Sequence, residues 1–165
     1  TITFAMLVGF VYLNTGLLRA ADNEAQLASV ISHEIAHVDR RHAIQRLQQA
    51  VIAEGLLTAG GLDQNAAISL GVELALHRPN SRTHELEADE TGLMLLIQAG
   101  YAPIAAVDFL QKLLDQPNAT PDFLSTHPHP EDRINALNER IDLATASNGK
   151  GLDEAAYRDH IRALL

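Results

Sequence analysis

The chain has 165 residues, of which 47% are hydrophobic, so it is long enough to bury the core of one ordinary domain. Its formal net charge is −9, from 21 acidic and 12 basic residues, which excludes a protein that follows nucleic-acid phosphates with clustered lysine and arginine. Cysteine is absent, so any metal must be held by histidine, aspartate and glutamate. We therefore expect a single domain over residues 1–165 and no nucleic-acid partner.

The chain opens on an apolar stretch, residues 1–13, which is rich in β-branched and aromatic residues and is followed by Asn14, Thr15 and Gly16. This composition predicts a strand that runs into a turn, either alone or as half of a hairpin. The stretch has no basic segment before it and is shorter than the roughly 20 residues of a membrane-spanning helix, so we expect neither a signal peptide nor an anchor. Because the chain starts at Thr1 inside this stretch, we expect a processed or excised part of a longer protein.

Apolar residues then recur at helical spacing along most of the chain. A first helix is predicted from the capping residues Asp22 and Asn23, past His42, to the glycine-rich stretch at 55–61. Residues 61–80 are ambiguous between a short helix and a flexible lid. Further helices are predicted from Ser81 to Gly100, over 101–116, from Pro130 to Ala144 and within 151–165. The expected fold class is mainly α with a small β-sheet.

The first helix contains the sequence HEIAH at residues 33–37. Side chains four apart on a helix are neighbours, so His33 and His37 project together and can grip one metal ion. Glu34 is rotated away from this pair but near enough to meet a water molecule on the metal, which suits a general base. Such a motif arises by chance in a chain of this composition with a probability of about 0.02. The motif alone leaves a histidine-rich solvated helix face as the alternative.

A catalytic zinc ion takes three protein ligands and a water molecule, so two histidines need a third ligand from another element. The second strong helix carries Glu85 and Asp89 four residues apart, so both can face the first helix. Glu85 is the candidate ligand, and Asp89 is the candidate acceptor for the free ring nitrogen of a metal-binding histidine. The spacing and the apolar residues that follow favour this interpretation over a solvated acidic face. Glu87 and Glu90 are assigned no role.

The sequence HEIAH followed by an E-x-x-A-D helix resembles the gluzincin clan of metallopeptidases, and within it the family of the CaaX prenyl protease, HtpX and BepA. In relatives the opening strand usually carries a pair of glycines, whereas this chain has LVGF at 7–10, a difference that should matter locally and not for the chemistry. The long membrane segments of some members are also missing, which places the chain near the soluble, BepA-like branch. The resemblance covers nearly the whole chain and is carried by VYLNTGLL at 11–18, DNEAQLASVISHEIAHV at 22–38, SRTHELEAD at 81–89, AGYAPIAAVDFL at 99–110 and THPHPEDRI at 126–134.

This resemblance implies a gluzincin-type catalytic domain, in which an HExxH helix packs against an ExxAD helix, and a zinc-dependent endopeptidase with one Zn²⁺ per chain. It implies His33, His37 and Glu85 as zinc ligands, Glu34 as the base and Asp89 as the residue behind a ligand, in agreement with the assignment from spacing. It also implies unfolded or misassembled proteins as substrates, in the periplasm or cell envelope of a bacterium. Peripheral membrane association and a helical-repeat domain outside this chain remain open.

His127 lies in the segment STHPHPEDRI, where Pro128 and Pro130 limit where its imidazole can point. Together with Arg133 and Tyr12 it is a candidate for stabilising the tetrahedral oxyanion. By similarity to the BepA-like branch, His127 is also a candidate latch that closes the open metal position, and a plain helix-start residue is the alternative. The opening strand could align an extended substrate along its edge. The remaining histidines are expected at the surface or at helix caps: His42, His77, His84, His129 and His160.

Two other functional classes stay open on the sequence alone. One is a latent, zinc-stabilised, chaperone-like binding module with little turnover, which engages clients through surfaces such as residues 61–80. The other is a structural helical domain with an accidental motif. Stoichiometric zinc would exclude the second class, and cleavage that is lost in a zinc-retaining Glu34→Gln protein would exclude the first.

Overall fold

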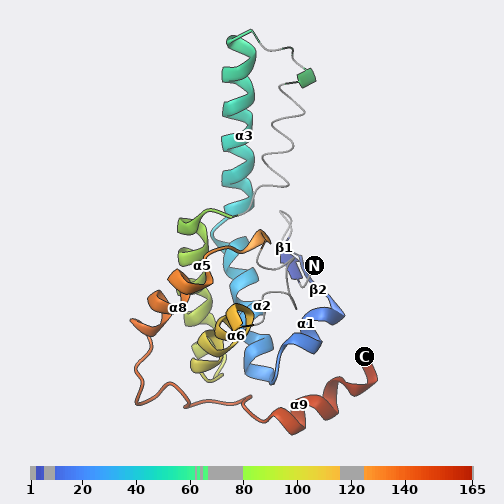
Figure 1. Ribbon diagram of the computed structural model, residues 1–165, viewed down its shortest axis with the longest axis vertical. Coiled ribbons are helices and arrows are strands. Elements are labelled where there is room, and N and C mark those ends of the chain that lie inside the picture. Colours follow the sequence, from blue (N-terminus) through green and yellow to red (C-terminus); the bar gives the residue numbers. More distant parts are fainter. Residues whose placement is uncertain are drawn as a thin grey trace.

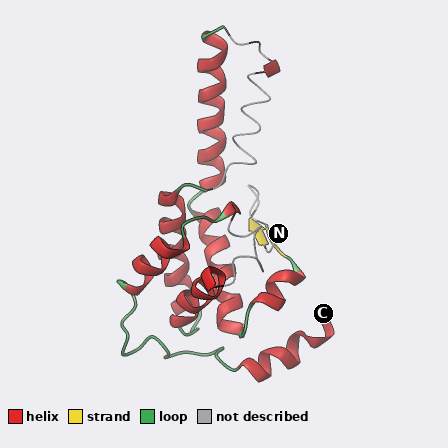
Figure 2. Cartoon of the chain, viewed as in Figure 1, coloured by secondary structure: helices red, strands yellow, loops and turns green. Residues whose placement is uncertain are grey.

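Figure 1 shows a computed structural model of the chain, which describes residues 3–5, 10–61, 63, 65–66, 80–115 and 125–164. Helices, drawn red in Figure 2, make up most of these residues, so the mainly helical prediction is confirmed. Two short strands, β1 (Thr3–Ala5) and β2 (Val11–Leu13), pair antiparallel, with Thr3 opposite Leu13. The helices are α1 (Thr15–Ala20), α2 (Glu24–Asp39), α3 (His42–Ala59), α5 (Arg82–Gln98), α6 (Ile104–Asp115), α8 (Pro130–Asn138) and α9 (Glu154–Ile161), followed by a 3₁₀ turn, η1 (Arg162–Leu164).

The hydrophobic core lies around α2, which contacts α5 and α6, while α8 packs against both α5 and α6. One buried side chain from each of five helices meets there: Leu17, Val30, Leu93, Phe109 and Leu137. Full burial of such a side chain stabilises the fold by about 1.5–3 kcal/mol. The core therefore holds α2 and α5 in place, the two helices that carry the predicted metal ligands.

Gly92 allows α5 to approach α2 closely. A Cβ atom at this position would lie 3.1 Å from both the Cα and the backbone nitrogen of His33, closer than ordinary packing permits. Because these are backbone atoms of a packed helix, a side chain at position 92 would push the two helices apart. Because glycine has no Cβ atom, Gly92 thus permits the short distance between α5 and the HEIAH segment of α2.

The predicted continuous helix from residue 22 past His42 is wrong, because the chain forms two helices there. Helix α2 ends at Asp39, and Arg41 adopts the left-handed conformation, with φ of 55°, before α3 begins at His42. A non-glycine residue in this conformation costs about 1–2 kcal/mol. A hydrogen bond that Arg40 Nε donates to Thr91 Oγ1, at 2.9 Å, ties the turn to α5. Beyond this turn α3 extends away from the other helices (Figure 1).

Two other boundaries differ from the predictions. Asn14 does not begin a simple turn but caps α1, since its Oδ1 accepts a hydrogen bond from the Gly16 backbone N–H at 2.8 Å. The helix predicted from Pro130 to Ala144 ends at Asn138, and the Asp142 carboxylate accepts a hydrogen bond from the Ala144 N–H at 3.0 Å, which favours a turn.

The ambiguous segment 61–80 falls almost entirely on residues outside the described ranges, so its helix-or-lid prediction stays untested. The short helix predicted in the tail is confirmed as α9. None of the helices in the described part of the chain combines the length and the apolar composition needed to cross a bilayer.

Candidate metal centre

Four buried side chains direct donor atoms toward one another: His33 and His37 from α2, Glu85 from α5, and His127 from the segment before α8. The Nε2 atoms of His33 and His37 are 3.0 Å apart. Glu85 faces both rings, with Oε2 at 3.4 Å from His33 Nε2 and Oε1 at 3.3 Å from His37 Nε2. The structure thus brings together the three residues predicted as metal ligands, from two helices far apart in the sequence.

The spacing and chemistry of these donors fit a zinc ion. Ligand atoms about 2.0–2.1 Å from a tetrahedral zinc ion lie about 3.3 Å from one another. The three ligand pairs among His33, His37 and Glu85 are separated by 3.0 to 3.4 Å, close to that value. Two imidazoles and one carboxylate are also the ligands of a well-known type of catalytic zinc site. These residues can therefore hold one metal ion.

The two imidazoles differ in proton affinity. Burial and the Arg133 charge lower the pKa of His33, but contacts with Asp89 and Glu85 outweigh them and raise it to about 9. Burial lowers the pKa of His37 to about 3. Burial raises the pKa of the Glu85 carboxyl, but the nearby Arg133 and His127 outweigh burial and hold this pKa well below its usual range. A metal ion that binds here would displace the proton of His33 and meet a carboxylate that is already ionised.

Arg133 joins the two buried acidic residues of α5, Glu85 and Asp89. Its Nε and Nη2 donate hydrogen bonds to Asp89 Oδ2 and Oδ1, at 2.7 and 2.8 Å, and its Nη1 forms an ion pair with Glu85 Oε2 at 2.9 Å. Asp89 Oδ1 also lies 2.9 Å from His33 Nδ1, on the side of the ring away from the other ligands. Burial raises the pKa of the Asp89 carboxyl, but the charge and hydrogen bonds of Arg133 outweigh burial and lower this pKa to about 2. Arg133 was expected only as one of three oxyanion candidates.

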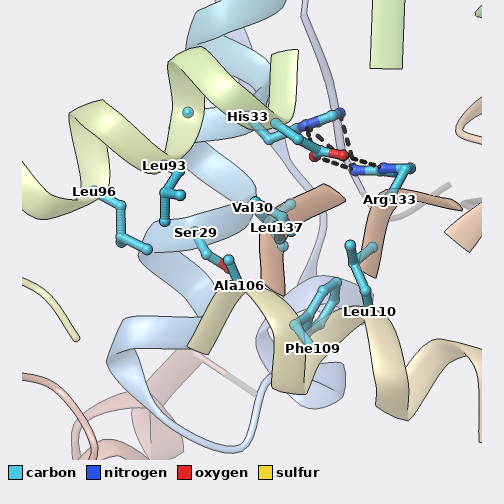
Figure 3. A pocket seen from close by; sticks show the side chains of 12 residues that line it. Ser29, Val30, His33, Leu93, Leu96, Ala106, Phe109, Leu110, Arg133 and Leu137 are labelled. Carbon is cyan, nitrogen blue, oxygen red and sulfur yellow. Dashed lines mark hydrogen bonds and ion pairs between the residues drawn. The ribbon is translucent and has the colours of Figure 1, made fainter. Parts of the chain in front are cut away.

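A pocket lies beside this polar group (Figure 3). His33 and Arg133 meet at its polar end, and the rest of its lining includes the apolar side chains of Val30, Phe109 and Leu137. Apolar surroundings strengthen the electrostatic contacts between the buried charges. The same surroundings make an unpaired charge costly, so the carboxylates and Arg133 depend on one another.

Glu34 lies beside the ligand cluster and is 2% exposed. Within the described residues its Oε1 accepts no well-directed hydrogen bond, although His127 Nε2 lies 3.3 Å away. A buried carboxylate oxygen without a hydrogen bond is unfavourable. Glu34 is thus ready to accept a hydrogen bond from a polar group that enters the site, as a general base requires.

The three oxyanion candidates lie in different surroundings. His127 is part of the donor cluster, with Nδ1 at 3.2 Å from Glu85 Oε1 and 3.3 Å from His33 Nε2. Arg133 is buried and directs its nitrogens to Asp89 and Glu85, as described above. Tyr12, on β2, is 48% exposed. Of the three, His127 is the one that belongs, with His33, His37 and Glu85, to the group of side chains that could hold a metal ion.

The surface or helix-cap location predicted for two other histidines is wrong, since both are buried and the N-caps of their helices are Arg41 and Ser81. His42 is 1% exposed and His84 is 7% exposed, and their rings stack with centroids 4.3 Å apart. For His42 the prediction failed because the turn at Arg41 directs this residue back toward α2 and does not let it continue along a straight helix. His129 and His160 are exposed as predicted, and His77 lies outside the described residues.

The sequence matches the model of peptidase family M48 over residues 3–141. It is similar to the Beta-barrel assembly-enhancing protease of Escherichia coli strain K12, with 37% identity over 147 residues that cover 79% of this chain and 30% of that protein. It is also similar to the mitochondrial metalloendopeptidase OMA1 of Arabidopsis thaliana, at 34% identity over 81% of this chain and 28% of that protein. OMA1 of Schizosaccharomyces pombe is 34% identical over 82% of this chain and 42% of its own length. The chain thus spans less than half the length of these relatives.

Proposed function

This chain belongs to peptidase family M48, and on that premise we propose that it is a zinc-dependent endopeptidase. His33, His37 and Glu85 are the zinc ligands in this proposal, and residues 1–165 form one catalytic domain in which the HExxH helix α2 packs against the ExxAD helix α5. The observation that carries the proposal is the convergence of these three buried donors, at 3.0 to 3.4 Å from one another, beside the Glu34 carboxylate.

The residues of the chain would divide the chemistry among them. When bound, zinc acidifies a water molecule and polarises the substrate carbonyl. Glu34 accepts the proton of the attacking water and returns it to the leaving amine. Asp89 keeps the proton of His33 on Nδ1, so that Nε2 faces the site. Arg133 keeps Asp89 ionised for this task, through two hydrogen bonds.

Digestion of unfolded casein before and after metal removal tests the proposal. We expect cleavage by the zinc-loaded chain, none after a chelator has removed the zinc, and recovery when one equivalent is returned, because the base alone cannot activate water at neutral pH. Metal analysis of each sample is the control. Unchanged cleavage by a chain shown to be free of metal would contradict the proposal. Stoichiometric zinc without any cleavage would instead favour the latent, chaperone-like binding module.

His127 is proposed to act as a latch on the metal site. Its Nδ1 lies within 3.4 Å of His33 Nε2 and of both Glu85 oxygens, among the donors that would surround the ion. Replacing His127 with alanine is expected to raise basal casein cleavage, by about 10-fold if the latched form is roughly nine-tenths populated.

His129→Asn is the matched control for the latch. His129 is an exposed histidine two residues away with φ of 61°, a conformation that asparagine tolerates, and this variant should cleave casein at the wild-type rate. Unchanged turnover in His127→Ala would remove the latch. Reduced turnover would remove it as well and would favour stabilisation of the oxyanion by His127.

The proposal extends to substrate and location. We infer that the substrates are unfolded or misassembled proteins of a bacterial periplasm or cell envelope, which the similarity to a protein named for β-barrel assembly supports. The similarity to mitochondrial enzymes supports the peptidase class but not this location. Strands β1 and β2 contact α2, a position that suits alignment of an extended substrate along a strand edge. Peripheral membrane association and a helical-repeat partner domain outside this chain complete the proposal.

A further inference from the structure

We propose that His42 and Glu87 form a positioning relay behind His37, which orients this imidazole for metal binding as Asp89 orients His33. The inference rests on the proposed zinc site. It concerns the residues behind His37, to which neither the motif nor the family match assigns a role. The relay consists of three groups in series, namely the His37 ring, the His42 ring and the Glu87 carboxylate.

The contacts of the relay run from the buried site to the surface. His37 directs Nε2 toward Glu85 and its other ring nitrogen, Nδ1, toward His42 Nδ1 at 2.8 Å. The far nitrogen of His42, Nε2, lies 3.2 Å from Glu87 Oε2. The His42 side chain is 1% exposed, whereas that of Glu87 is 47% exposed. His42 therefore uses both ring nitrogens, one on a proposed ligand and one on a carboxylate.

The positions of the protons follow from the metal-bound state. When His37 Nε2 binds a metal, the proton of this ring is on Nδ1 and can be donated to His42. His42 Nδ1 must then be the acceptor, which places the His42 proton on Nε2, facing the Glu87 carboxylate. Each contact thus has one donor and one acceptor. A carboxylate hydrogen-bonded to a metal-binding histidine fixes the tautomer of that histidine and makes it a better ligand. Here the His42 imidazole lies between the two groups and transmits the effect of Glu87 to His37.

The turn between α2 and α3 makes the contact between His37 and His42 geometrically feasible. His37 and His42 are five residues apart, so on a continuous helix their side chains would project about 140° from one another around the axis and could not meet. The left-handed residue Arg41 breaks the helix and directs His42 back toward His37. His84, from α5, stacks on the His42 ring at an interplanar angle of 11° and fixes its plane. An unfavourable backbone conformation is thus retained where it orients a residue behind the site.

Zinc affinity, measured by competition with a chromophoric chelator, tests the relay. His42→Phe keeps a ring in the buried space but removes the acceptor, and we expect zinc affinity to fall about 10- to 100-fold. His42→Asn restores an acceptor near the position of Nδ1 and should recover much of this loss. In cobalt-substituted protein the visible absorption bands should shift in His42→Phe and return toward the wild-type position in His42→Asn. Thermal unfolding of the metal-free proteins controls for loss of fold.

Glu87 and Glu90 provide a matched surface pair on α5. Both are exposed carboxylates, but among the described residues Glu90 forms an ion pair with Arg140, at 3.4 Å, and none with a histidine. Glu87→Gln should weaken zinc binding by about 2- to 5-fold, since the lost charge is partly screened by solvent, and Glu90→Gln should leave the affinity unchanged. This comparison decides the matter if His42→Phe does not fold.

The outcomes separate the relay from the site it serves. Wild-type zinc binding together with a His42→Phe affinity within twofold of the wild type would overturn the relay alone. Equal affinities of Glu87→Gln and Glu90→Gln would also overturn the relay, because its terminal carboxylate would then contribute nothing to zinc binding. A wild-type chain that binds no zinc would overturn the proposed zinc site and the relay with it.

Discussion

Replacing Glu34 with glutamine is expected to lower kcat/KM for unfolded casein by about 10²- to 10⁴-fold while one zinc ion stays bound per chain. Position 34 is 2% exposed, so a change of side-chain shape there would disturb the packing of α2. The glutamine amide has nearly the shape of the carboxylate, so this substitution should leave the packing intact. It removes the ability to accept the proton of the attacking water. Because Glu34 is not among the proposed ligands, metal content and activity should separate in this variant.

Initial rates of cleavage and zinc content of the same samples check this prediction. Glu139→Gln, a substitution of the same kind at an exposed position after α8, is the control and should cleave at the wild-type rate. A Glu34→Gln protein that retains zinc and cleaves within tenfold of the wild-type rate would show that another group acts as the base.

Replacing Arg133 with methionine is expected to lower the free energy of unfolding of the metal-free chain by about 3–5 kcal/mol. Arg133 is 2% exposed and neutralises Asp89 and Glu85, which are 7% and 0% exposed. Methionine retains much of the volume but removes the guanidinium that both carboxylates contact, so the His33 imidazolium beside them balances only part of their negative charge. Such an uncompensated charge is among the most destabilising changes in a protein interior.

Urea unfolding of chelator-treated protein measures this effect without a contribution from bound metal. Arg140→Met is the matched control, because Arg140 and its partner Glu90 have side chains that are 42% and 50% exposed and form a surface pair. That control should lose at most about 1 kcal/mol. A loss in Arg133→Met no larger than that of the control would mean that Asp89 and Glu85 do not depend on Arg133.

Local spacing was sufficient to predict the central residues of the site. Residues three and four apart share a helix face whatever surrounds the helix, so the HEIAH segment defined one pair of donors and the pair Glu85 and Asp89 defined another. Because a catalytic zinc ion takes a third protein ligand, the two helices were predicted to pack together. The structure brings these side chains together, although their catalytic roles stay proposals.

The features that the sequence did not reveal depend on contacts distant along the chain. No glycine or proline marks the turn at Arg41, so a continuous helix was predicted and His42 was expected at the surface. The turn is tied to α5 through the hydrogen bond from Arg40 to Thr91, which no local pattern shows. Arg133 and Asp89 are 44 residues apart, and an arginine in a charged helix start is usually solvated. Its burial follows from the way α8 packs against α5.

One zinc ion is proposed to bind between α2 and α5, held by His33, His37 and Glu85. Diffraction from a crystal of the zinc-loaded chain, recorded on both sides of the zinc absorption edge, would locate this ion. We expect one anomalous peak, about 2.0–2.2 Å from His33 Nε2, His37 Nε2 and a Glu85 carboxylate oxygen. A peak held by other residues, or no peak in a chain that retains stoichiometric zinc in solution, would contradict the proposal.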